Sequence, residues 1–492
     1  MAWRHRANSI GFVALVAIVV LSPLPFGANR PFFWFLFSSL VGLLLIWWGV
    51  GAVAARAPGG TVPVVPLARY WREALLTAAL GLWFLIQAAA WTPETLHHPV
   101  WAATALLTTE VHSEFHSGVH SAISATPDET MDAWVRFLAY GGTFFLAMQY
   151  GRDPKHARLA LWSVAVAGLV YGGYGLIIYF GNFQTILWYQ RWAYADSLTA
   201  TFVNRNSFAA FGGMTLVCSL ALLSSVERRA GAFIVREGRG AYLERLAGHG
   251  LLLLVGAIVI LTAVLLSHSR AGLLATALGC TAYYFCRRRA KRGTDRRSEG
   301  AERRSGDRKD DERRRGDWRS WQAITPLVLA ITMIFVIIFS GAATWQRVDR
   351  NSLTDAGVRL AIYDATLTGI FDRPLFGHGM GSYRHVFEAY RTPELTRVAT
   401  LDKAHNSYLE FAFEAGIPAL LVLMAIFASL FVRCVLGARR RQRDSMYPAV
   451  AVGTATLLAA HSLVDFSLQI PAITFLFLFG IGFAQSWSSR DS

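Results

Sequence analysis

Apolar runs recur from one end of the chain to the other, and short polar connectors separate them. A helix needs roughly 20 apolar residues to cross a bilayer, and shorter runs suffice when flanking side chains reach the interface. The pattern therefore predicts an all-α, polytopic membrane protein with about twelve spans. We expect the spans at Ser9–Phe26, Phe32–Ala55, Ala74–Trp91, Asp132–Tyr150, Leu159–Phe180, Ser207–Val226, Gly250–Ser267, Ala271–Cys286, Trp321–Ala343, Ala415–Val432, Tyr447–Val464 and Leu468–Trp487.

The connectors divide the chain into three parts. Residues 1–343 hold the first nine expected spans, residues 344–407 form a long connector, and residues 408–492 hold the last three spans. Residues 287–320 are charged and of low complexity, so we expect a disordered cytoplasmic loop near anionic lipids. Residues 344–407 mix aromatic, apolar and charged residues with Gly and Pro. That composition predicts a partly helical loop that caps the membrane bundle.

Basic residues alternate between the connectors. Those on the side of the N-terminus are rich in Arg and Lys, for example around Arg152 and Arg439, whereas residues 92–131 contain none. Cytoplasmic loops of membrane proteins carry such an excess. Both termini are therefore expected in the cytoplasm, and residues 344–407 on the opposite face.

Composition supports a membrane protein. Hydrophobic residues make up 54% of the 492 residues, which is more than soluble chains of this size tolerate. A net charge of +15 could indicate nucleic-acid binding, but the charges lie in the short connectors. They fit membrane orientation and anionic lipids instead. The four cysteines lie in apolar runs or beside basic connectors, so no disulfide framework is implied.

Several ionisable residues lie at expected span ends, where charges are costly and often functional. Arg270, in "SHSRAGLLA", is either an interfacial anchor or a bidentate ligand for phosphate or carboxylate. Arg359 has the same functional interpretation, or forms a surface ion pair with Asp355 or Asp364. Both interpretations remain open for each arginine.

His405 and Asn406 precede the tenth expected span in "AHNSYLEFAFEAGIPALL". A histidine there can accept a proton near neutral pH, or it can simply stabilise the helix start. The same face holds Asn204 and Asn206 in "FVNRNSFAAF" and Asp465 in "HSLVDFSLQIPA". The convergence of these polar residues favours a functional site over isolated structural roles.

His112, His116 and His120 are spaced so that one helical face could present all three to zinc or copper. Gly and Ser residues in this segment weaken a helix, so a flexible polar loop is the favoured interpretation and no metal is expected. No P-loop and no zinc-protease motif is present.

The ordered motifs resemble the O-antigen ligase and polymerase superfamily of bacterial membrane enzymes. The resemblance rests on the four motifs quoted above together with "RLAIYDATLTGIFDRPLFGHGMGSY". It implies a GT-C-like, metal-independent inverting glycosyltransferase of the inner membrane, without a cofactor. The donor would be an undecaprenyl-diphosphate-linked glycan at the periplasmic face, and the acceptor lipid A-core or another glycan.

Carried onto this chain, the resemblance implies that Arg270 and Arg359 hold the donor diphosphate and that His405 activates the acceptor hydroxyl. The motifs do not separate a ligase from a polymerase. A bicarbonate or other small-solute transporter is the alternative from another class, with the same residues lining a pathway.

Overall fold

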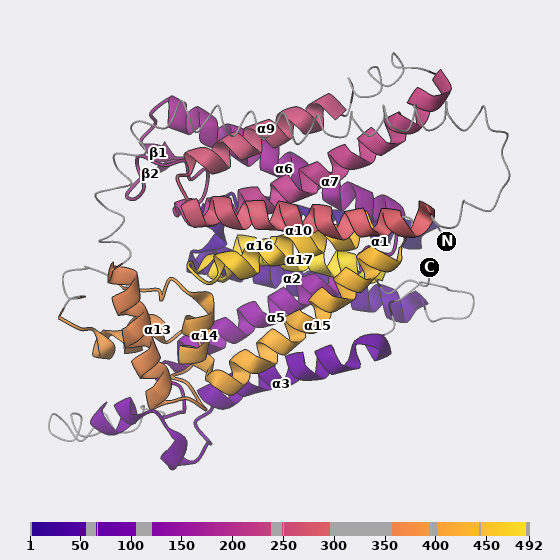
Figure 1. Cartoon of the computed structure of the whole chain (residues 1–492). Coiled ribbons are helices and arrows are strands. Elements are labelled where there is room, and N and C mark those ends of the chain that lie inside the picture. Colours follow the sequence, from indigo (N-terminus) through magenta and orange to yellow (C-terminus); the bar gives the residue numbers. More distant parts are fainter. Residues whose placement is uncertain are drawn as a thin grey trace.

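The computed structural model describes residues 2–55, 65, 67–104, 121–237, 248, 250–295, 357–393, 395, 401–441 and 444–488. Helices dominate these residues, and one short antiparallel hairpin accompanies them (Figure 1). The helices are α1 (Ala2–Leu21), α2 (Pro31–Ala55), α3 (Trp71–Ala88), α5 (Pro127–Tyr150), α6 (Pro154–Phe180), α7 (Arg205–Glu237), α9 (Leu251–Leu266), α10 (Arg270–Asp295), α13 (Tyr383–Val386), α14 (Ser407–Ala415), α15 (Ile417–Arg440), α16 (Met446–His461) and α17 (Pro471–Ser488). The hairpin pairs β1 (Thr185–Ile186) with β2 (Tyr189–Gln190), and the 3-10 turns are η1 (Phe26–Ala28), η2 (Leu67–Tyr70), η3 (Glu94–Leu96), η6 (Phe387–Tyr390) and η7 (Ser467–Gln469).

Each expected span within the described residues overlaps with a helix. By length and composition, helices α2, α6, α7, α15 and α17 could cross a membrane. Two shorter apolar helices lie at Asn8–Leu21 and Leu251–Leu266. An all-α membrane protein is thereby confirmed, and the number of twelve spans stays a prediction. The ninth expected span, Trp321–Ala343, lies outside the described residues.

One boundary differs from the expectation. The eighth span was expected to end at Cys286, with disorder from Arg287 onward, but α10 continues to Asp295. The first residues of the charged segment 287–320 are therefore helical. Arg and Lys are good helix formers, so a helix started by an apolar run can continue past it.

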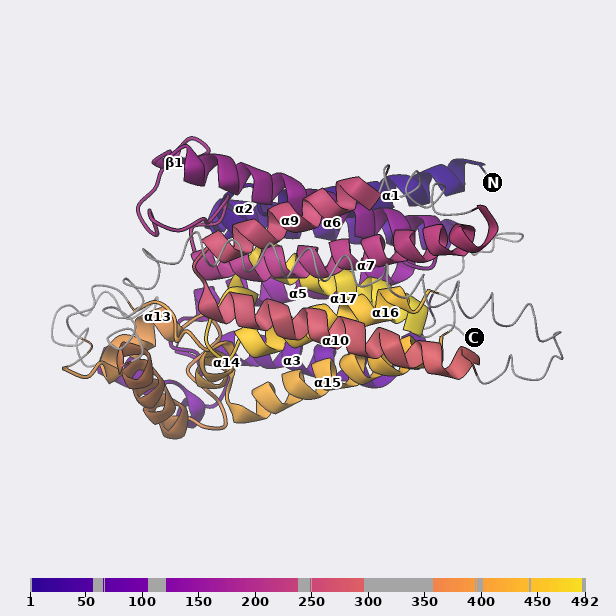
Figure 2. The ribbon, with the colours of Figure 1, turned by 45° about the horizontal axis from the view of Figure 1, so that its top comes forward.

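The helices run back and forth between two ends of the bundle. Both termini lie at one end, whereas β1, β2, α13 and α14 lie at the other (Figures 1 and 2). We call the latter the loop end. It corresponds to the face that the basic-residue pattern predicts to be outside the cytoplasm.

Helix α7 lies at the centre of the bundle and α2 at its periphery. In the most apolar window of each helix, 89% of the residues of α7 are buried inside the protein, against 17% for α2. Helices α10 and α16 approach closely through two glycines, because a Cβ on Gly279 would lie 2.7 Å from the carbonyl oxygen of Gly453. This packing brings the start of α10 and the end of α16 to the loop end together.

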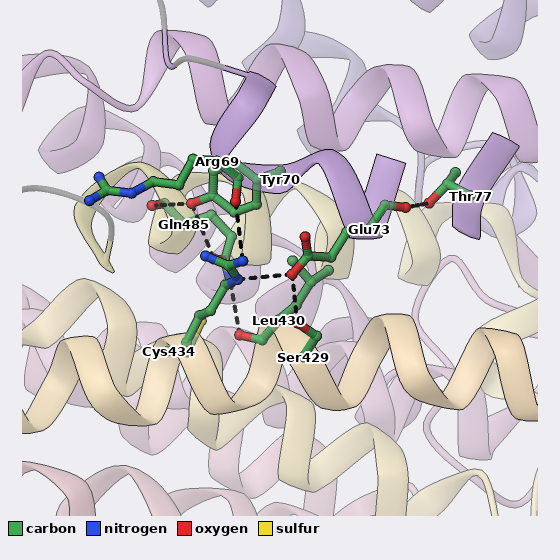
Figure 3. Close-up of polar contacts among 9 residues, drawn as sticks. Arg69, Tyr70, Glu73, Thr77, Ser429, Leu430, Cys434 and Gln485 are labelled. Atoms are coloured by element: carbon green, nitrogen blue, oxygen red, sulfur yellow. Dashed lines mark hydrogen bonds and ion pairs between the residues drawn. The ribbon is translucent and has the colours of Figure 1, made fainter. Parts of the chain in front are cut away.

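An ion pair joins α3 and α15 at the opposite end (Figure 3). Arg433 Nε donates to Glu73 Oε1 at 2.9 Å, and Ser429 donates to the same oxygen. Tyr70 lies under the Arg433 guanidinium and donates to the backbone of Gln485 in α17. The charge of the buried Glu73 is thus paired and hydrogen-bonded, as a charge in an apolar bundle must be.

Cysteine labelling tests the orientation of the bundle. Gln184→Cys, beside β1, should react with an impermeant thiol reagent in intact spheroplasts, whereas Arg440→Cys, at the end of α15, should react only after permeabilisation. Both positions are exposed on the protein surface. The four native cysteines, which lie within helices, are replaced first to remove background labelling. The opposite labelling pattern would invert the predicted orientation.

Candidate functional site

A hydrogen-bond network at the loop end joins three segments that are distant in sequence. Asp465, between α16 and α17, is fully buried. Its Oδ1 accepts from Asn206 Nδ2 at 2.9 Å, and its Oδ2 accepts from Ser467 Oγ. Ser269, before α10, donates to Asn206 Oδ1 at 2.8 Å. Both carboxylate oxygens of Asp465 therefore have donors, which a buried charge requires.

Helix caps set the positions of two of these residues. Asn204 Oδ1 accepts from the backbone N–H of Asn206 at 2.7 Å and so caps α7. Ser269 Oγ accepts from the N–H of Gly272 at 3.1 Å and caps α10. Arg270 is then the first residue of α10, at a helix N-terminus that favours anions. Its side chain is exposed.

His405 lies in a turn that directs its ring toward this network. Its φ of +51° lies in the left-handed region, which costs energy for a non-glycine residue and is common at functional sites. The hydroxyl of Tyr363 donates to its carbonyl at 3.0 Å, and its ring packs edge-on against Phe466 at 5.3 Å between centroids. Its Nδ1 is buried and has no hydrogen-bond partner among the described residues.

Other residues fill the structural roles that His405 could have had. Asn406, not His405, caps α14, because its Oδ1 accepts from the N–H groups of Tyr408 and Leu409. Glu410 is buried, and its two oxygens accept from Lys403 Nζ at 3.2 Å and from the N–H of Ala404 at 2.8 Å. The cap of α14, the structural role expected for His405 as an alternative, is therefore filled by Asn406.

Arg359 and Asp465 both act electrostatically on His405. Burial lowers the pKa of His405; Asp465 raises that pKa, and Arg359 lowers it. Among the described residues, no ion pair joins Arg359 to Asp364, and Asp355, the other expected partner, lies outside them. Because the net shift of the pKa is downward, the imidazole is neutral at pH 7 and its unpaired nitrogen can accept a proton.

A second histidine extends the network. His461 Nδ1 lies 3.2 Å from Ser467 Oγ. Since that hydroxyl donates its proton to Asp465, the ring must donate from Nδ1, which leaves a lone pair on Nε2. This Nε2 is also buried, and no residue in the described part of the chain bonds to it. The sequence placed His461 in the same zone, and the structure joins it to Asp465 through Ser467.

The segment that carries Arg359 and His405 has its own hydrophobic core. Ile362, Tyr383, Phe387 and Phe413 belong to it, together with six smaller contributors: Ala365, Ile370, Leu395, Leu401, Ala404 and Ala412. Residues 357–372 form a helix in this segment. The core holds the two charged side chains on a folded unit rather than on a free loop.

The glycine-rich motif "FGHGMGSY" attaches this unit to the bundle. Gly377, Gly379 and Gly381 all have positive φ, which only glycine adopts freely. Between them, His378 Nδ1 lies 2.9 Å from His98 Nε2. Burial lowers the pKa of His378 to about 4, so the pair is uncharged at neutral pH. This motif is structural.

The structure thus brings together His405, Arg359, Asp465 and Asn206, and it assigns Asn204 and Asn406 to helix caps. The sequence missed Ser269, Ser467 and Tyr363, although each lies within a quoted motif and a hydroxyl near a charged residue could have indicated it. His112, His116 and His120 lie outside the described residues. Within the described ranges, no three potential metal ligands cluster.

Comparison with known proteins confirms the resemblance over part of the chain. Residues 255–424 match the model of the O-Antigen ligase family. This segment runs from α9 into α15 and contains Arg270, Arg359 and His405. No curated protein matches the chain. The match supports a membrane enzyme of the ligase or polymerase type, a family that acts in general on polyprenyl-linked glycans and lipid acceptors.

The network predicts opposite outcomes for two similar substitutions. Asn206→Asp replaces the donor to Asp465 with a second carboxylate, which should cost about 1–3 kcal/mol of stability. The loss should be larger at pH 8 than at pH 5, because protonation of one carboxyl restores a donor. Asn204→Asp keeps a side-chain oxygen that accepts hydrogen bonds from the N-terminal N–H groups of α7. This variant should therefore have the melting temperature of the native protein. The melting temperatures of the two detergent-solubilised variants test this prediction. An equal loss of stability in both variants would contradict the hydrogen-bond network.

Proposed function

We propose that this chain, with its O-antigen ligase domain at residues 255–424, transfers a glycan from an undecaprenyl diphosphate carrier. The reaction takes place at the loop end, on the periplasmic face of the bacterial inner membrane, and both termini are cytoplasmic. The observation that carries the proposal is the buried, unpaired Nδ1 of His405 within electrostatic reach of Asp465 and Arg359.

His405 acts as the general base. A sugar hydroxyl of the acceptor is a poor nucleophile, and a neutral imidazole can take its proton as the new bond forms. The acceptor oxygen attacks the anomeric carbon, the bond from that carbon to the diphosphate oxygen breaks, and the configuration inverts. The imidazolium that results is stabilised by the Asp465 carboxylate, which its two donors keep in place.

Arg270 and Arg359 hold the leaving diphosphate. The carrier diphosphate gains negative charge as it departs, and fixed guanidinium groups stabilise that charge without requiring a metal ion. The N-terminus of α10, where Arg270 is located, adds the partial positive charge of its free N–H groups. Because the donor already contains an energy-rich diphosphate bond, the reaction needs no cofactor.

The acceptor is lipid A-core or another envelope glycan in a ligase, and a second carrier-linked repeat in a polymerase. The arrangement supports both reactions equally. Transport of a small solute is less well supported, because the titratable residues of the site gather at one end of the bundle rather than near its middle.

The first functional prediction concerns the two arginines. Arg270→Lys and Arg359→Lys keep the charge but lose the planar fork, so each should lower glycan transfer strongly. Arg384→Lys, at an exposed position in the same outer segment, is the matched control and should leave transfer unchanged. Transfer is measured with purified enzyme, lipid-linked donor and acceptor. If both variants transfer glycan at the native rate, the arginines do not hold the diphosphate and serve as interfacial anchors or ion-pair partners.

The second functional prediction concerns His405. His405→Ala should lower transfer by about a hundredfold to ten-thousandfold, the usual range for loss of a general base. His405→Gln should restore little of the transfer rate, because a side-chain amide is not basic enough to take the proton. His385→Ala, at an exposed histidine of the same segment, should leave the rate unchanged. A folded Ala variant with the native rate rules out catalysis by His405.

A further inference from the structure

A hollow opens at the loop end, outside the site described above. Five aromatic side chains and one arginine line it: Phe26, Phe33, Trp188, Tyr189, Trp192 and Arg30. Its cavity volume is about 270 Å³, and it is open to solvent. Its two walls are distant in sequence. One is the connector between α1 and α2 with the start of α2, and the other is the hairpin β1–β2 with the residues after it.

The rings form a continuous wall. Phe26 packs edge-on against Trp188 and Tyr189, at 6.2 and 5.6 Å between centroids, and Tyr189 packs in the same way against Trp192 at 5.3 Å. The Arg30 guanidinium lies 5.4 Å from the centroid of Trp192, and no described carboxylate pairs with it. The arginine is therefore held by a ring face, with its hydrogen-bond donors available to a ligand.

Two strained turns build this wall. Phe26 and Ala28 have φ values of +55° and +58°, and Leu187, in the hairpin turn, has +55°. Non-glycine residues rarely adopt this region, and they hold it only where surrounding contacts impose it. Meanwhile the ring faces remain accessible, because Trp188 is 71% exposed and Trp192 52% exposed. The strained turns therefore place these aromatic side chains at the surface instead of burying them.

The hollow lies next to the proposed catalytic network. The turn at Gly27 packs against Phe202 and Ile470, whose side chains would lie 2.9 Å from a Cβ placed on that glycine. Phe202 shortly precedes the α7 cap at Asn204, and Ile470 follows Ser467. The turn that carries Phe26 is therefore in contact with the two segments that supply Asn206 and Ser467, the donors to Asp465.

We propose that this hollow binds a pyranose unit of the lipid-linked glycan, a subsite that rests on the proposed function. The C–H face of a pyranose ring stacks on an aromatic face, and its hydroxyl or carboxylate oxygens accept from an arginine. A pocket with both features fits a sugar better than it fits an acyl chain, which offers no acceptor for the free donors of Arg30. Interfacial anchoring of separate Trp and Tyr residues is the competing account.

Saturation-transfer NMR on the full chain in nanodiscs tests the subsite directly. The probe is the polysaccharide that mild acid releases from the producing cells' own lipid-linked pool, so the carrier diphosphate is absent. The wild type should transfer saturation to the sugar ring protons. The double variant Trp188→Ala/Trp192→Ala should bind about tenfold more weakly, as expected from the loss of two stacking faces, and Trp188→Phe should retain binding.

Trp91→Ala is the matched control. Trp91 follows α3 at the loop end and is 77% exposed, but it does not line the hollow. It should bind the polysaccharide like the wild type. No saturation transfer in the wild type, or an equal loss in the Trp91 variant, overturns the subsite in favour of anchoring.

Glycan transfer by the same preparations separates the two proposals. The double variant should show a raised KM for the lipid-linked donor with little change in kcat. A wild type that binds the polysaccharide but transfers no glycan overturns the proposed function and keeps the subsite. A wild type that transfers glycan without binding the free polysaccharide overturns the subsite alone.

Discussion

The buried carboxylate of Asp465 is the constraint on which the loop end depends. A fully buried charge is tolerated only where donors replace the water it has lost. Asn206 from α7 and Ser467 from the connector after α16 supply them, and Ser269 before α10 fixes the orientation of Asn206. Because the donors to this one carboxylate come from different segments, its hydrogen bonds hold the ends of several helices together.

The segment that carries Arg359 and His405 brings these two side chains to the same end of the bundle. Arg359 and His405 are separated in sequence, but both belong to a unit with its own hydrophobic core. Bonds from Gln87 to the carbonyls of Phe376 and Glu414 attach this unit to α3, and Ser407 bonds to the backbone of Asp465. Rigid attachment at both sides lets a loop residue keep a buried, unpaired nitrogen, which a mobile loop would expose to water.

The strained turns near the site follow a common principle. His405, Phe26 and Leu187 all hold positive φ without being glycine. Each is fixed by a contact from elsewhere: the Tyr363 hydroxyl bonds His405, ring packing holds Phe26, and the Tyr174 hydroxyl accepts from the N–H of Leu187. Tertiary contacts thus maintain strain both beside the hydrogen-bond network of Asp465 and in the wall of the aromatic hollow.

The sequence by itself determined the helices, because a span needs a long apolar run whatever its neighbours are. It also determined the membrane class, and it placed His405, Arg359, Asn206 and Asp465 in one zone, since alternating spans return polar ends to the same face. The match at residues 255–424 covers the motifs that carry Arg270, Arg359 and His405, whereas "FVNRNSFAAF" and "HSLVDFSLQIPA" lie outside it.

Only the tertiary structure decided what each of these residues does. Asn204 and Asn206 look equivalent in "FVNRNSF", yet one caps α7 and the other binds Asp465. The aromatic hollow combines residues near position 30 with residues near position 190, so no local pattern could reveal it. The physical reason is that helix formation depends on neighbouring residues, whereas hydrogen-bond partners and pocket walls depend on how distant segments pack.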